Sequence, residues 1–289
     1  MPAVSQKALN QRLLYRDNFT EFARDCLTIR TKTGALSPLT LNKAQTYLHE
    51  CLERQRRETG KVRAIILKGR QQGCSTYVEA RFYWRTIHRF GVRTFILAHE
   101  KDSTNAIYEM ARRYHENCPE AMKPNTGASN AKELVFDRLD SGYRIGTAGN
   151  DTVGRGTTLQ YFHGSEVACW ATRGEASIST GVLQAVGDVA DTEIILESTA
   201  NGEGGFFHSE TMKALKGGGD YQLVFIPWFW REEYRRPQPI DFEPTGPERA
   251  LITQYGLDNE QLMWRRNKII ELSTGAMDGD KAFMQEYPS

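Results

Sequence analysis

Short apolar runs along the chain predict five buried strands. These runs cover residues 64–67, 94–98, 159–163, 193–197 and 222–226. A continuous apolar run of this length is typical of a parallel strand that is covered on both faces. Two further segments, residues 132–136 and 143–145, flank a glycine-bearing turn and predict a β-hairpin.

Segments with the apolar spacing of helices lie between these strands. They cover residues 43–57, 75–90, 177–190 and 206–216, with one more beginning at residue 102 or 103. The repeated order of strand and helix implies parallel pairing. The pattern therefore predicts an α/β fold in three layers, with a mainly parallel central sheet.

The chain has 289 residues, enough for one large domain or for one domain with an appendage. Residues 235–247 contain four prolines and no periodicity, which predicts a connector. Two amphipathic helices are expected beyond it. We therefore expect a helical lead-in at 1–60 packed on the core, a core at 61–232 and a small helical linker region at 233–289.

Composition narrows the class of protein. The net charge is +1, so no global basic field points to nucleic acid. The five cysteines are scattered without metal-binding spacing, which favours free thiols in a reducing compartment. The longest apolar run, residues 223–230, is too short for a bilayer and contains Pro227. We expect a soluble intracellular protein with no membrane partner.

The turn after the first strand has the layout of a phosphate-binding loop. Gly69 and Gly73 bracket a basic turn, and a helix opens at Ser75. Backbone N–H groups at such a helix start point toward an anion, and the helix dipole favours negative charge there. The usual pattern GxxxxGK[ST] has lysine where this chain has Cys74. An ordinary strand–turn–helix corner is therefore the alternative.

A carboxylate follows the strand at 159–163. Ligands of open α/β sheets bind at the carboxyl ends of strands, and Glu166 lies at such an end. A glutamate there can orient a water for attack on a γ-phosphate. Ser165 stands where an aspartate usually helps to hold Mg²⁺. The alternative is that Glu166 caps a helix or lies on the surface.

Four segments resemble the large terminase subunits of tailed double-stranded DNA phages. They read HGSEVACW at 163–170, ESTANG at 197–202, YGLDNEQLMWRR at 255–266 and QEYPS at 285–289. Those subunits are ATP-driven motors that pump DNA into procapsids, and the resemblance runs from about Leu41 to the last residue. It implies a P-loop ATPase of the ASCE (RecA-like) type. In that family a linker and a nuclease domain follow, and we expect the chain to end where the nuclease would begin, without nuclease activity.

The resemblance implies a role for each residue of the loop. It places ATP against Lys68, Gly69, Arg70, Gln71, Gln72, Gly73, Cys74, Ser75 and Thr76. The missing lysine charge is expected at the start of the loop, on Arg70 first and on Lys68 second. Cys74 would offer only its backbone, and Ser75 would bind Mg²⁺ through its hydroxyl. Glu166 matches the catalytic Walker B glutamate, with Ser165 beside it on the metal side.

Three further residues gain a role only from the resemblance. Gln45 is similar to the adenine-reading glutamine that precedes Walker A, and Asn201 to a γ-phosphate sensor in a coupling motif. Arg155, between two glycines, is similar to an arginine finger that reaches a neighbouring subunit. The alternatives are an exposed helix glutamine for Gln45, and a surface or DNA-contacting arginine for Arg155.

The resemblance also implies partners and a location. These are ATP, Mg²⁺, double-stranded DNA, the portal protein, the small terminase subunit and further copies in a pentameric ring, at the portal vertex of a procapsid in the host cytoplasm. Two alternatives remain. A helicase-like ATPase would need a second RecA-like domain, for which there is no room after Trp230. A scaffold that binds nucleotide or DNA without hydrolysis is suggested by Cys74 and Ser165.

Overall fold

The centre of the protein is an eight-stranded sheet in the order β10-β3-β9-β8-β4-β7-β6-β5. The computed structural model describes residues 6–130, 132–147, 158–170, 181–273 and 278–289. The strands are β3 (Val62–Lys68), β4 (Arg93–Ala98), β5 (Ala128–Ser129), β6 (Glu133–Phe136), β7 (Ser141–Thr147), β8 (Tyr161–Ser165), β9 (Glu193–Ser198) and β10 (Gln222–Ile226). Neighbouring strands from β10 to β7 run parallel to each other. β6 is antiparallel to β7, and β5 is antiparallel to β6. The predicted α/β class with a mainly parallel sheet is confirmed.

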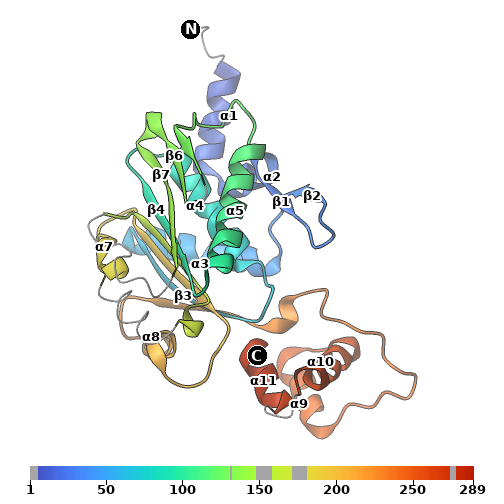
Figure 1. Cartoon of the computed structure of the whole chain (residues 1–289). Coiled ribbons are helices and arrows are strands. Elements are labelled where there is room, and N and C mark those ends of the chain that lie inside the picture. Colours follow the sequence, from blue (N-terminus) through green and yellow to red (C-terminus); the bar gives the residue numbers. More distant parts are fainter. Residues whose placement is uncertain (1–5, 131, 148–157, 171–180, 274–277) are drawn as a thin grey trace.

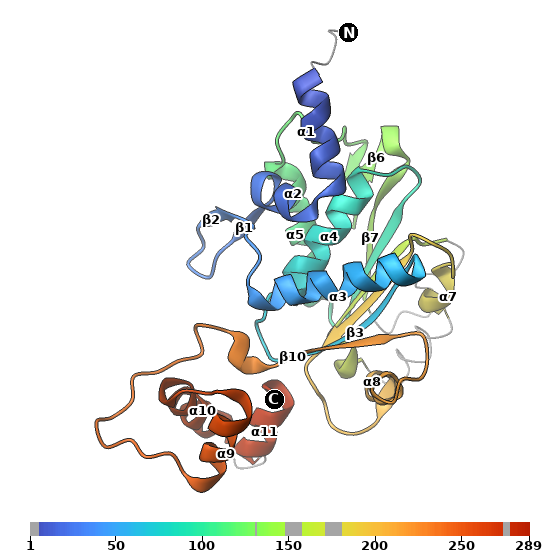
Figure 2. The ribbon, with the colours of Figure 1, turned by 180° about the vertical axis from the view of Figure 1, so that it is seen from behind.

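Helices cover both faces of this sheet. On one side lie α2 (Phe19–Cys26), α3 (Lys43–Thr59), α4 (Cys74–Ile87) and α5 (Lys101–Asn117), and on the other α8 (Gly205–Leu215) (Figures 1 and 2). Alternate residues of β3 point into the hydrophobic clusters on opposite faces of the sheet. Ile66 belongs to the same cluster as Phe82 of α4, whereas Ile65 belongs to the cluster that contains Phe207 of α8. Burial on both faces explains the unbroken apolar run, and each such side chain contributes about 1.5–3 kcal/mol.

The C-terminal segment forms a smaller helical group with its own core. It comprises α9 (Gly246–Tyr255), α10 (Asn259–Leu272) and α11 (Gly279–Glu286), which lie beyond the carboxyl end of β3 (Figure 1). The Tyr234 and Trp264 rings stack with centroids 4.1 Å apart, and Trp228 and Phe283 pack around them. Trp228 directly follows the last strand, so this cluster joins the helical group to the sheet.

The N-terminal segment departs from the prediction. After α1 (Gln6–Asp17) and α2, an antiparallel hairpin of β1 (Thr28–Arg30) and β2 (Leu36–Pro38) interrupts the expected helical lead-in. The pairing needs a turn, which Gly34 supplies with a φ of 86°. The prediction of a helical lead-in was therefore wrong at 28–38, where β-branched residues and a glycine turn favour a hairpin.

The helix expected at 177–190 ends earlier than predicted. Residues 171–180 lie outside the described part of the chain, and α7 covers only Leu183–Ala185. Val186, directly after α7, instead forms a β-bridge with Leu159, and β8 begins at Tyr161. No helix in the described ranges is both long and apolar enough to cross a bilayer.

Candidate nucleotide-binding site

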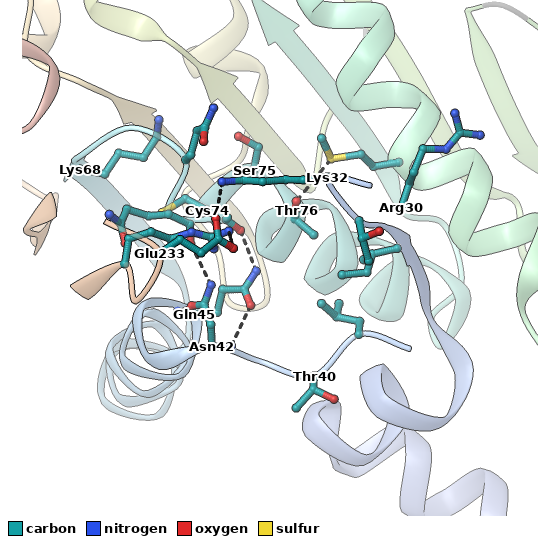
Figure 3. Close-up of a pocket in the computed structure, with 18 of the residues that line it drawn as sticks. Arg30, Lys32, Thr40, Asn42, Gln45, Lys68, Cys74, Ser75, Thr76 and Glu233 are labelled. Carbon is teal, nitrogen blue, oxygen red and sulfur yellow. Dashed lines mark hydrogen bonds and ion pairs between the residues drawn. The ribbon is translucent and has the colours of Figure 1, made fainter. Parts of the chain in front are cut away.

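A cavity of about 660 Å³ lies where β3 ends and α4 begins. Side chains from the β1–β2 hairpin, the start of α3, the β3–α4 turn and the end of β8 line it (Figure 3). This volume falls within the range of small-molecule sites, roughly 300–1,000 Å³. The cavity therefore brings the predicted loop and the predicted strand-end carboxylate to one place.

The loop has an unusual backbone with steric reasons for its glycines. Gln71 and Gly73 have φ values of 56° and 81°. A Cβ on Gly73 would lie 2.7 Å from Nε2 of Gln45, and one on Gly69 would lie 2.8 Å from Cα of Trp228. Gly73 is also the N-cap of α4 and offers no side-chain bond to its first N–H groups. The first turn of α4, which lines the cavity, thus leaves amides free for an anion.

The start of α3 holds this loop in place. Gln45 Nε2 donates to the carbonyl of Gly73 at 2.9 Å, and Asn42 Nδ2 donates to the carbonyl of Gln72 at 3.2 Å. Oε1 of Gln45 accepts the backbone N–H of Asn42, which completes a capping box. Gln45 lines the cavity, and both of its polar atoms already have protein partners. Reading of adenine by Gln45 stays a prediction.

The structure places Lys68, and not Arg70, at the cavity. Lys68 Nζ lies 3.1 Å from Oε1 of Glu166, and its side chain is buried. Arg70 points the other way, with its Nε 2.6 Å from Oε2 of Glu286 on α11 and its side chain 60% exposed. Lys68 is therefore the better placed of the two cations, because the Arg70 side chain is directed toward the C-terminal helices. Which of them contacts the phosphates stays a prediction.

A second carboxylate lies beside the loop, and the sequence prediction missed it. Glu197 on β9 is fully buried, and its Oε1 accepts the hydroxyl protons of Ser75 and Ser165, the latter at 3.1 Å. Lys68 Nζ is 3.9 Å from its Oε2. Ser165, expected on the metal side, does not line the cavity. The available signal for Glu197 was a carboxylate directly after the apolar residues 194–196 of β9.

His163 joins Glu197 to a second buried carboxylate, Glu79. Its Nδ1 lies 2.6 Å from Oε1 of Glu79, and its Nε2 lies 3.2 Å from Oε1 of Glu197. Burial would lower the pKa of His163, but the hydrogen bonds to Glu197 and Glu79 outweigh it and raise the pKa to about 9. Burial likewise opposes ionisation of Glu197, but Lys68 and His163 lower its pKa to about 2.

The pKa of Lys68 also depends on burial and on neighbouring charges that act in opposite directions. Burial alone would lower its pKa, yet the carboxylates of Glu197 and Glu166 raise it, so the ammonium stays charged. Burial raises the pKa of the Cys74 thiol, which leaves a neutral side chain in the usual lysine position. The positive charge next to the loop therefore comes from Lys68 at the end of β3 and not from the usual lysine position.

The remaining predicted residues are less central. Asn201 does not line the cavity, since its Nδ2 donates to the carbonyl of Ala168 at 2.9 Å and its Oδ1 accepts from Gln285. Thr76 lines it, with its hydroxyl 3.8 Å from the sulfur of Met110. Arg155 lies outside the described residues, so its predicted role stays a prediction.

The donor set suits a polyphosphate with a divalent cation. Free amides at the start of α4 and the Lys68 ammonium suit phosphate oxygens. The described residues contain no group of three or more His, Cys, Asp or Glu able to hold a metal ion. Mg²⁺ is often held by one or two protein oxygens together with substrate phosphates, and the Ser75 hydroxyl is such a donor.

Comparison with known proteins identifies the fold. No protein-family model and no curated protein sequence matches the chain. The HK97 bacteriophage large terminase matches with a TM-score of 0.64 at 14% identity, over 94% of this chain and 54% of that one. The large terminase ATPase domain of Thermus phage P74-26 matches at 0.51 and a substituted form of it at 0.54, both at 16% identity over 85% of this chain and 92% of theirs.

The chain thus spans about half the length of the HK97 large terminase. At these identities the likeness is one of fold, and it extends over nearly all of the chain. The chain has the fold of the ATPase domains of phage large terminases.

Proposed function

We propose that the chain is the ATP-hydrolysing motor domain of a viral terminase, which translocates double-stranded DNA into a procapsid. The observation that carries the proposal is the convergence of the uncapped start of α4, Lys68 and Glu166 on one cavity. The fold and the terminase-like motifs support the same function. The fold alone would not, since one fold serves many activities.

In this proposal the loop binds the phosphates of ATP. The amides of residues 74–76 and the Lys68 ammonium face the β- and γ-phosphates, and the Ser75 hydroxyl faces Mg²⁺. The ion, when bound, neutralises charge on the phosphate oxygens. Ile29 and Leu39 also line the cavity and are available to the nucleoside. Gln45 would have to give up one of its protein hydrogen bonds in order to read the adenine.

The Lys68–Glu166 ion pair suggests how binding prepares the site. Phosphate oxygens compete with Glu166 for the Lys68 ammonium, and the carboxylate that loses this partner is free to accept a proton from water. Glu166 stands at a φ of 51°, directly after β8. Backbone strain of this kind persists where surrounding structure enforces it, and it is common at active sites.

The partners of a packaging motor belong to the same proposal. They are double-stranded DNA, the portal protein, the small terminase subunit and further copies of the chain in a pentameric ring. The site of action is the portal vertex of a procapsid in the host cytoplasm. Arg155 of one subunit is proposed to reach the nucleotide of its neighbour.

The proposal is tested by measuring ATP binding and phosphate release, with and without double-stranded DNA, for the wild type, Glu166→Gln and Glu120→Gln. Loss of a general base lowers turnover by about 10²–10⁴-fold, so Glu166→Gln should bind ATP and release almost no phosphate. Glu120→Gln makes the same change on an exposed side chain outside the cavity and should keep turnover.

Normal turnover by Glu166→Gln would place the catalytic carboxylate elsewhere. ATP binding by the wild type without turnover, at every protein concentration and with DNA present, would instead favour the scaffold. Two replacements motivate this second candidate: Cys74 stands for the usual lysine, and Ser165 stands for the usual aspartate.

A further inference from the structure

Glu197 and Ser165 are direct neighbours across two parallel strands. Their Cα atoms are partners in the β8–β9 register, and the Ser165 hydroxyl donates to Oε1 of Glu197 at 3.1 Å. The two side chains therefore lie on the same face of the sheet. A carboxylate on β9 thus occupies space next to the position where β8 would carry its metal-side aspartate.

The Ser75 hydroxyl also donates its proton to Oε1 of Glu197. A hydroxyl has one proton and two acceptor lone pairs. Because Glu197 takes the proton, the lone pairs of Ser75 Oγ stay available on the side of the cavity that Ser75 lines. This is the orientation that a serine needs in order to offer its oxygen to a cation.

The other carboxylate oxygen of Glu197, Oε2, lacks a hydrogen-bond partner among the described residues. The side chain is nevertheless fully buried, and Lys68 Nζ lies 3.9 Å from Oε2. Buried carboxylate oxygens without partners are rare and point to an absent ion or water.

Glu193, on the same strand, shows what a purely structural buried carboxylate looks like here. Arg81 donates to both of its oxygens at 2.7 and 2.9 Å, and Arg85 Nε lies 2.9 Å from Oε1. Glu193 is thus fully paired by cations, whereas Glu197 is bonded to two hydroxyls and a histidine beside a substrate-sized cavity.

We propose that Glu197 is the carboxylate that positions the nucleotide-bound Mg²⁺. It takes the part of the usual aspartate, whose position is occupied by Ser165 in this chain. The inference rests on the proposed function, because the ion arrives with ATP. Glu197 is a positioning residue that acts through Ser75. Its negative charge also balances the cation, so removal of that charge should affect binding with and without metal in opposite directions.

The test is the affinity for a fluorescent ATP analogue, measured in EDTA and in Mg²⁺, for the wild type, Glu197→Gln, Ser165→Ala and the double variant Ser165→Asp/Glu197→Gln. Glu197→Gln should bind as tightly as the wild type or more tightly in EDTA, since it removes a negative charge near the phosphates. In Mg²⁺ it should bind at least tenfold more weakly than the wild type. Ser165→Ala keeps the carboxylate and should keep the Mg²⁺ effect.

The double variant returns a carboxylate to the same place from β8, so it should fold and recover the Mg²⁺ effect. Electron paramagnetic resonance of Mn²⁺ with ADP gives a second readout. Wild type and double variant should immobilise the ion, and Glu197→Gln should not. A merely structural role would weaken binding equally in EDTA and in Mg²⁺.

The outcomes separate the inference from the function on which it rests. An unchanged Mg²⁺ effect in Glu197→Gln overturns the role of Glu197 and leaves the ATPase proposal intact. If Glu197→Gln does not fold, a folded double variant without any Mg²⁺ effect overturns it as well. A wild type that binds no nucleotide in either condition overturns both proposals.

Discussion

Nε of Arg70 lies 2.6 Å from Oε2 of Glu286, which fastens the β3–α4 turn to the last helix of the chain. The backbone N–H of Arg70 donates to the carbonyl of Glu286 at 3.0 Å, and the Tyr234 hydroxyl donates to the carbonyl of Arg70 at 2.8 Å. The turn that lines the cavity is thus also one of the places where the core contacts the C-terminal segment. A change in the conformation of the β3–α4 turn would therefore act directly on the C-terminal helices.

The first prediction separates the two cations of the turn. Lys68→Ala should weaken ATP binding by at least tenfold, because it removes a buried charge that lines the cavity and charge-assisted hydrogen bonds contribute about 1.5–3 kcal/mol each. Arg70→Ala is the matched control and should change affinity by less than about threefold, since an exposed ion pair contributes little. Titration with a fluorescent ATP analogue measures both. If Arg70→Ala alone lost most of its affinity for ATP, Arg70 and not Lys68 would be the main phosphate-binding cation, as expected from the sequence.

Much of the fold was predictable from the sequence because both faces of the sheet are covered. A strand such as β3 then reads as an unbroken apolar run, and helical spacing between runs gives the layers. The hairpin at 28–38 was missed because its strands are short and largely exposed, so they carry no apolar signal.

The site was only partly predictable, for a physical reason. The sequence placed two basic residues in one turn, but the direction of each side chain depends on contacts from far along the chain. Gly69 packs against Trp228, and Arg70 meets Glu286, more than 150 residues later. Glu197 was missed because hydroxyl partners from α4 and β8 meet it only in the folded sheet.

The second prediction concerns pH. The folded pKa of His163 is about 9, against 6.5 for an unperturbed histidine, so protonation is favoured in the folded state. The stability from His163 is therefore complete below pH 6.5 and is lost as pH rises toward 9. At about 1.4 kcal/mol per pKa unit the loss is on the order of 3 kcal/mol.

Urea unfolding of wild type, His163→Gln and His208→Gln at pH 6, 7.5 and 9 measures this effect. His163→Gln should be less stable at pH 6 and should show a flatter pH dependence. His208 lies on α8, outside the carboxylate network, so its variant should follow the wild type. Parallel curves for all three proteins would mean that His163 does not carry the charge.

The third prediction tests the packing that sets the loop. A Cβ at Gly69 would lie 2.8 Å from Cα of Trp228, and neither backbone can move without shifting the sheet or the aromatic cluster. Gly69→Ala should lower the free energy of unfolding by about 1–3 kcal/mol, as overpacking does. Gly246→Ala meets no atom within 4 Å, lies at the start of α9 and should be neutral or stabilising. Equal urea midpoints for both variants would contradict the close approach.

The fourth prediction uses complementation to ask whether Arg155 acts on a neighbouring subunit. Arg155→Ala should bind ATP normally and lose most turnover, since arginine fingers contribute about 10³–10⁵-fold. Glu166→Gln should be inactive for a different reason, because it lacks the carboxylate at its own site. In a mixed ring, Arg155 of a Glu166→Gln subunit can face the intact Glu166 of an Arg155→Ala subunit. Mixing the two inactive proteins should therefore restore part of the phosphate release, and wild-type turnover should rise steeply with protein concentration. Two proteins that stay inactive when mixed, with a wild type whose specific activity is independent of concentration, would place Arg155 in its own subunit's site or outside catalysis.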